Sequence, residues 1–192
     1  MPWPGQFSQA REATGKYSRA VATAVWVVMF SRHLGFDGAG LQNLAVGGLL
    51  LDIGYISLSN DVLNTTGALY KDELLQVRQH VQAGIEVLRR SNIDEPAILD
   101  MLEYHHERYD GSGYPHQLKG RDITPHGRIA GIVDCYDAMT TKSSYSPAQG
   151  AYAAARELNE MRDQQFHAEV VEQFLKMIGM FPTGIDPMEN FI

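Results

Sequence analysis

The segment from His105 to Pro115 constrains the fold of this chain more than any other part of it. Two adjacent imidazoles can reach one metal ion only where the backbone bends, so His105 and His106 are expected where a helix ends and a rigid loop begins. Within that loop, Gly111 and Gly113 allow a positive φ or a close approach of two backbones, and Pro115 fixes the exit of the chain. The segment therefore predicts a metal site at a helix–loop junction.

Two carboxylates accompany these histidines. Glu107 and Asp110 lie too close to them in sequence to be incidental. Such carboxylates either orient metal-binding imidazoles through hydrogen bonds or brace the loop itself. The sequence leaves both roles open.

Helical periodicity recurs along the chain between short loops rich in Gly, Pro and Asn, and no convincing alternating strand pattern is present. The predicted helices span residues 8–34, 41–57, 71–91, 94–106, 125–139, 147–161 and 167–180. A long Gly/Pro loop covers 107–124. We therefore expect an all-α bundle of about seven helices, with one domain over residues 1–182 and a tail or linker over 183–192 that can lead to a further domain.

Composition excludes several functional classes. The chain has 192 residues and a formal charge of −7, which argues against binding to a nucleic-acid backbone. Its single cysteine, Cys135, cannot form an internal disulfide, which favours a reducing, cytoplasmic setting. The first residues lack the basic and apolar pattern of a signal peptide, and the longest apolar stretch is about half the length that a bilayer requires. We therefore expect no membrane partner.

Further candidate ligands lie on predicted helices. Asp52 falls on the buried face of the helix over 41–57, where a carboxylate needs a cation, a hydrogen-bond network or a raised pKa. Asp134 and Asp137 are one turn apart on a face of small residues, so Asp134 is expected to bind metal and Asp137 to support it. His80 precedes Gly84 by one turn, which clears space beside its ring.

The eleven residues from His105 match the HHExxDGxGYP signature at every fixed position, and the chain resembles HD-GYP domains over about residues 12–180. The resemblance implies an HD-type helical bundle and a metal-dependent phosphodiesterase that opens cyclic di-GMP. The positions that match metal ligands of that family are Asp52, His80, His105, His106 and Asp134.

The same resemblance exposes losses. Leu51 replaces the histidine of the HD dyad, Tyr17 replaces another ligand histidine, and Tyr55 replaces the lysine that assists catalysis. One metal position of the family would thus keep only two carboxylates. The other retains its complete set, Asp52, His80, His105 and His106, which suits one Fe, Mn, Ni or Zn ion.

The nucleotide-binding side has losses as well. Gly113 and Tyr114 match the family segment beside the bound nucleotide. Ser143 and Ser146 stand where the family has an arginine and a lysine, and Lys142 is the neighbouring charge that can partly replace them. Each lost charge-assisted contact to phosphate costs about 1.5–3 kcal/mol of binding, so weak binding of cyclic di-GMP or a related dinucleotide is expected.

Three functional hypotheses follow. The preferred one is a degenerate HD-GYP domain, a regulatory or interaction module with one metal ion or none, whose exposed Gly-Tyr-Pro loop docks a protein such as a diguanylate cyclase domain. The alternative is an active cyclic di-GMP phosphodiesterase with an altered metal site, working with one metal or with Tyr17 as a phenolate ligand. The third is a helical domain that binds neither metal nor nucleotide.

Overall fold

The computed structural model describes residues 13–59, 70–141 and 148–180, with side chains described from Ser18 onward. The α-helices are α1 (Ala13–His33), α2 (Gly38–Leu50), α4 (Lys71–Arg78), α5 (His80–Arg90), α6 (Pro96–Tyr104), α7 (Pro125–Thr140), α8 (Ala151–Glu160) and α9 (Ala168–Met177). Two short 3-10 helices, Ile53–Ser57 and Gly120–Asp122, complete them. Among the described residues the sole β feature is an isolated bridge between Arg162 and Phe166, so the predicted all-α class is confirmed.

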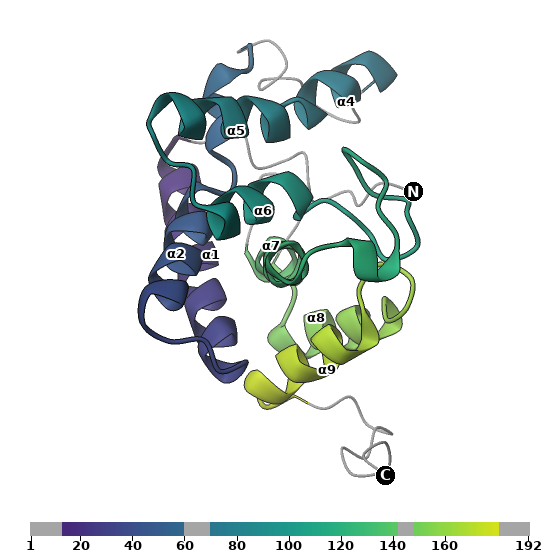
Figure 1. Cartoon of the computed structure of the whole chain (residues 1–192). Coiled ribbons are helices and arrows are strands. Elements are labelled where there is room, and N and C mark those ends of the chain that lie inside the picture. Colours follow the sequence, from purple (N-terminus) through teal and green to yellow (C-terminus); the bar gives the residue numbers. More distant parts are fainter. Residues whose placement is uncertain (1–12, 60–69, 142–147, 181–192) are drawn as a thin grey trace.

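Helix α7 forms the centre of the molecule. Figure 1 shows it end-on, with α1 and α2 on one side, α5 and α6 above, and α8 and α9 below. Its start follows from local sequence: Thr124 caps the helix by accepting from the Gly127 amide at 3.1 Å, and Pro125 occupies the first turn. Nearly every residue from Gly127 to Met139 is buried, so two acidic residues of this helix, Asp134 and Asp137, lie inside the protein.

Two predicted helices are interrupted in the structure. The helix expected over 41–57 ends at Leu50 and resumes as a 3-10 helix at Ile53, which leaves Asp52 in a turn. The helix expected over 71–91 breaks at Gln79 into α4 and α5. Hydrophobic periodicity continues across both interruptions, so it could not reveal them. Both breaks lie beside candidate metal ligands.

A close backbone crossing joins these two interruptions. A Cβ atom on Gly54 would lie 1.8 Å from the carbonyl oxygen of His80 and 2.6 Å from the amide nitrogen of Gly84. Only glycine fits such an approach. A Cβ on Gly84 would in turn lie 3.4 Å from the amide nitrogen of Gly54, so both glycines take part in this close approach, and the crossing fixes where the turn of Asp52 meets α5.

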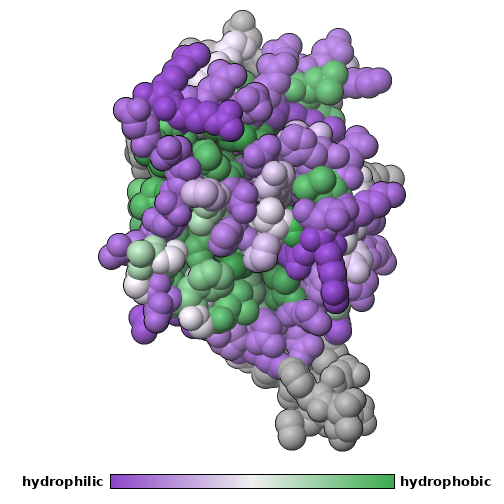
Figure 2. Space-filling model, in the orientation of Figure 1, coloured by the Kyte–Doolittle hydropathy of each residue, from purple (hydrophilic) through white to green (hydrophobic). Residues whose placement is uncertain are grey.

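Helices α1 and α2 also expose apolar side chains. Val21, Val25 and Met29 follow one face of α1, and Val46 and Leu49 are exposed on α2. Apolar atoms reach the surface on this side of the molecule in Figure 2. The segment Gly38–Ser57 is long and apolar enough to cross a membrane by length and composition, with 28% of its window buried. The helix is broken after Leu50, and the segment packs against α1, α5 and α6.

The Gly54 crossing gives the first prediction. Gly54→Ala should destabilise the fold by about 3 kcal/mol or more, because the new methyl group meets backbone atoms that cannot rotate away. The matched control is Gly40→Ala in α2, where the nearest atom to a new Cβ is 3.8 Å away and removal of a helical glycine stabilises by up to about 1 kcal/mol. Urea unfolding of both variants measures the difference. Equal stabilities would contradict the crossing.

Candidate metal centre

Four side chains converge at the meeting point of α2, α5 and α6. Asp52, His80, His105 and His106 each offer one ligand atom, and these atoms all lie within 4.8 Å of one another. The three histidines are at most 4% exposed, whereas the carboxylate side chain of Asp52 is 37% exposed. The cluster is therefore a buried imidazole pocket that reaches solvent at the Asp52 side.

Helix ends orient two of the imidazoles. His80 follows the last residues of α4, and its Nδ1 lies 2.7 Å from the carbonyl oxygen of Val77. His105 follows the end of α6, and its Nδ1 lies 2.8 Å from the carbonyl oxygen of Leu102. Carbonyls in the last turn of a helix lack a full set of partners within the helix, so they accept side-chain hydrogen bonds. Donation from Nδ1 leaves each Nε2 with its lone pair directed at the cluster.

The donor atoms have the spacing that a shared metal ion requires. Nε2 of His80 and Nε2 of His106 are 3.3 Å apart, and Oδ1 of Asp52 lies 3.8 and 3.9 Å from Nε2 of His80 and His105. Nε2 of His105 is buried without a hydrogen-bond partner among the described residues. A buried, unpartnered imidazole nitrogen is costly unless something else binds it. Three imidazoles and a carboxylate thus fit a single transition-metal ion.

Electrostatics keep this donor set ready for a cation. Burial, followed by the neighbouring His105, lowers the pKa of His80 to about 4, although Asp52 opposes the shift. Burial and the neighbouring imidazoles also lower the pKa of His106 well below its ordinary value. Desolvation alone would raise the pKa of Asp52, but the positive charge of Arg19 and the two nearby imidazoles lower it. Neutral imidazoles beside an ionised carboxylate are the protonation states that bind metal.

Asp134 lies outside this four-residue cluster, and its role as a metal ligand stays a prediction. Its Oδ1 is paired with Nη2 of Arg19, a residue of α1 that the sequence reasoning missed. Nε of Arg19 also donates to Oδ2 of Asp137 at 3.2 Å, and the hydroxyl of Thr23 donates to the same oxygen at 3.3 Å. The signal was present in the sequence, because Arg19 and Thr23 are polar residues one turn apart on a predicted core helix.

The loop after His106 is braced by its own residues. Oε1 of Glu107 accepts from the amide of His116 at 2.7 Å, and Oε2 accepts from the amide of Leu118 at 3.0 Å. Oδ1 of Asp110 accepts from the amide of Ser112 at 2.8 Å. Of the two roles that the sequence left open for these carboxylates, these contacts are those of loop bracing.

Both glycines of the loop lie where a larger residue would be strained or would clash with the backbone. Gly111 has a φ of +83°, and a Cβ on Gly113 would lie 2.4 Å from the amide nitrogen of Arg108. The loop thus folds back against its own first residues. This holds it beside the histidines from which it starts.

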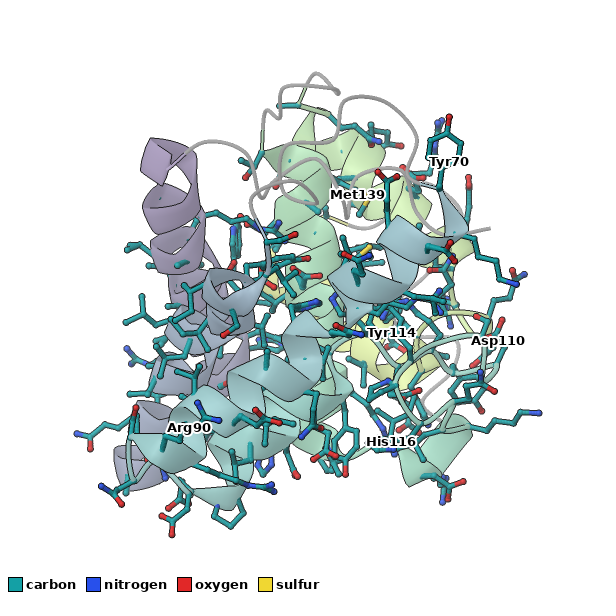
Figure 3. All side chains as sticks on the ribbon, turned by 90° about the horizontal axis from the view of Figure 1, so that it is seen from above. Tyr70, Arg90, Asp110, Tyr114, His116 and Met139 are labelled. Atoms are coloured by element: carbon teal, nitrogen blue, oxygen red, sulfur yellow. The ribbon has the colours of Figure 1, made fainter. Side chains whose placement is uncertain are left out.

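Tyr114 is buried, although the sequence predicts an exposed Gly-Tyr-Pro loop. Its side chain is only 8% exposed. The ring stacks on His106 with centroids 4.6 Å apart, and the guanidinium carbon of Arg78 lies 4.6 Å from its centroid. Figure 3 shows Tyr114 inside the molecule, while Asp110 and His116 of the same loop lie toward its edge. Tyr114 therefore supports a histidine of the cluster.

Two of the replaced positions are also buried or packed. Tyr55 stacks on His80 with ring centroids 4.3 Å apart and an interplanar angle of 4°, so it covers an imidazole face. Leu51 is 4% exposed within the main apolar core. The remaining sequence-predicted positions, Lys142, Ser143 and Ser146, and the side chain of Tyr17 lie outside the described residues.

Comparisons with known proteins identify the family of this chain. The family model of the HD domain matches residues 7–170. A cyclic di-GMP phosphodiesterase of Pseudomonas aeruginosa is 31% identical over 88% of this chain and 40% of its own length. A cyclic di-GMP phosphodiesterase of Thermotoga maritima is 33% identical over 77% of this chain and 40% of its own. The chain thus spans about two fifths of the length of these relatives.

Solved structures share the fold. The HDG"Y"P protein Bd1817 of Bdellovibrio bacteriovorus superposes with a TM-score of 0.69 at 18% identity, covering 88% of this chain and 54% of that one. A cyclic GMP-AMP specific phosphodiesterase of Vibrio cholerae superposes with a TM-score of 0.63 at 19% identity, covering 91% of this chain and 47% of the other. From its matched family model, the chain belongs to the HD domain family, and it carries the HHExxDGxGYP signature at residues 105–115.

Proposed function

We propose that this domain binds one transition-metal ion through Asp52, His80, His105 and His106 and works in cyclic di-GMP signalling as a hydrolytically impaired regulatory module. The observation that carries the proposal is the contrast between two halves of one site. In one half, four candidate ligand atoms lie within 4.8 Å of one another. In the other half, the carboxylate of Asp134 is paired with the guanidinium of Arg19. The two relatives that are cyclic di-GMP phosphodiesterases suggest the class of nucleotide.

Hydrolysis is the step that this arrangement impairs. A metal ion held by the cluster would act as a Lewis acid toward a phosphodiester oxygen. Two-metal phosphodiesterases also require a second ion about 3.5–4 Å away to clamp the opposite side of the reaction. Here the second position has lost its imidazole at Leu51, and the family lysine is replaced by Tyr55. Burial, followed by the negative charge of Asp52, raises the pKa of Tyr55 well above its ordinary value, so its hydroxyl stays protonated at neutral pH.

A protein partner, which the family resemblance suggests is a diguanylate cyclase domain, would meet a different part of the loop from the one first expected. Tyr114 is buried, whereas Pro115, His116 and Gln117 are exposed. These exposed residues are the ones to replace in a test of such docking.

Metal content gives the second prediction. Elemental analysis after dialysis should find at most one tightly held ion of Fe, Mn, Ni or Zn per chain. His105→Ala should abolish it, because the ligands act as a set around one ion. His116→Ala is the matched control, since this loop histidine is exposed and paired with Glu103. Two ions per chain in the unmodified protein, or an unchanged content in His105→Ala, would contradict the proposed site.

Turnover gives the third prediction. Cyclic di-GMP, 3′3′-cyclic GMP-AMP, the linear dinucleotide and bis(p-nitrophenyl) phosphate should be hydrolysed at trace rates or not at all by the metal-loaded protein. The cyclic di-GMP phosphodiesterase of Thermotoga maritima, assayed with the same metals, is the positive control. Calorimetric titration with cyclic di-GMP should show weak binding. Turnover comparable to that of the control would favour the alternative, an active phosphodiesterase with an altered metal site.

Tyr114 gives the fourth prediction. Tyr114→Ala should lower the stability by about 2–5 kcal/mol, as large-to-small replacements in a core do, and should weaken metal retention because His106 loses the ring stacked on it. Tyr114→Phe keeps that ring and should keep both properties. Thermal unfolding and metal content of the two variants provide the measurement. Full stability in Tyr114→Ala together with lost nucleotide binding would assign the residue to ligand contact instead.

A further inference from the structure

The most buried arginine–carboxylate pairs among the described residues join Arg19 to two aspartates of α7. Arg19 projects from α1, which packs against α7. Its Nη2 pairs with Asp134 and its Nε with Asp137, so one edge of the guanidinium engages both carboxylates. The side chain of Arg19 is 11% exposed, and those of Asp134 and Asp137 are 4% and 2% exposed. Such a pair lies largely outside solvent screening.

The charge of Arg19 also reaches the metal cluster. Its guanidinium lowers the pKa of Asp52, the carboxylate of the four-ligand set. In turn Asp134, Asp52 and Asp137 raise the pKa of Arg19 and overcome the lowering effect of its burial. Arg19 is thus paired with two carboxylates, and its charge also acts on a third, which belongs to the cluster. That is the electrostatic setting of a bound cation.

A guanidinium and a metal ion compete for this setting. A divalent ion beside Asp134 would compete with Nη2 of Arg19 for that carboxylate. It would also be repelled by the fixed positive charge, and repulsion between like charges is strong in a buried site. Arginine suits this role better than lysine, because its planar fork holds two carboxylates at once and it stays charged at every accessible pH.

We propose that Arg19 is a built-in cation that occupies the place of a second metal ion beside Asp134 and thereby limits this domain to one metal. This extends the proposed function, since it takes the four-ligand cluster as the site of the first ion. Arg19 acts through its ion pairs with Asp134 and Asp137. The absence of a second ion then has two causes, which are the positive charge of Arg19 and the replacement of the family's histidine by Leu51.

The test counts Mn²⁺ bound per chain by equilibrium dialysis in excess MnCl₂, because carboxylate oxygens suit this ion and weak binding is still counted. Arg19→Ala should bind one more Mn²⁺ per chain than the unmodified protein. Arg19→Ala combined with Asp134→Asn should lose that extra ion, and Arg19→Lys should not gain it. Arg32→Ala, an exposed arginine of the same helix, is the matched control and should bind as the unmodified protein does.

Thermal unfolding provides a second readout that does not depend on counting ions. In EDTA, Arg19→Ala should melt below the unmodified protein, because two buried carboxylates have lost their counter-charge. Added Mn²⁺ should recover most of that loss, and it should raise the melting temperature of Arg19→Ala more than that of Arg32→Ala. A melting temperature that stays low in Mn²⁺, with no extra ion bound, would show that Arg19 is a structural ion pair only and would overturn the proposal.

These metal counts distinguish a failure of this inference from a failure of the proposed function. If the unmodified protein binds no ion and Arg19→Ala binds one that Asp134→Asn removes, the four-ligand cluster fails as a metal site and the role of Arg19 stands. If the unmodified protein binds one ion and Arg19→Ala also binds one, the cluster stands and the role of Arg19 fails.

Discussion

The hydrogen bonds from two histidine rings to carbonyls at helix ends are the constraint on which the site depends. His80 and His105 each reach back to a carbonyl three residues earlier, and in both cases a helix has just ended. The break at Gln79 is therefore more than an irregularity of a long helix, because it places His80 at such an end. Both rings are fixed in tautomer and direction before any metal arrives, which reduces the entropy lost when one binds.

The two halves of the site solve the same electrostatic problem in different ways. Buried carboxylates require a counter-charge. Asp52 lies beside three imidazoles, whereas Asp134 is paired with the guanidinium of Arg19, which is part of the chain and cannot leave. If the cluster holds one metal ion, as proposed, that ion and the guanidinium together supply the positive charge of a binuclear centre.

Local patterns in the sequence predicted much of the fold, and they failed where contacts join distant segments. The helix–loop junction at His105, the glycines of the loop and the helical class all follow from residues close together in sequence. The pairing of Arg19 with Asp134 joins residues 115 positions apart, so no spacing rule could reveal it. The burial of Tyr114 depends likewise on Arg78 and His106 meeting its ring, which loop composition does not encode.

The crossing at Gly54 separates what holds the shape of this domain from what gives it chemistry. Gly54 has no side chain that could take part in chemistry, yet a single carbon added there would collide with the backbone of α5. Leu51 and Tyr55, on either side of it, pack in the core and on His80, at positions where the family resemblance implies reactive groups. A scaffold of this kind can gain or lose reactive side chains while its backbone fold stays the same. A shared fold alone is therefore a poor guide to activity.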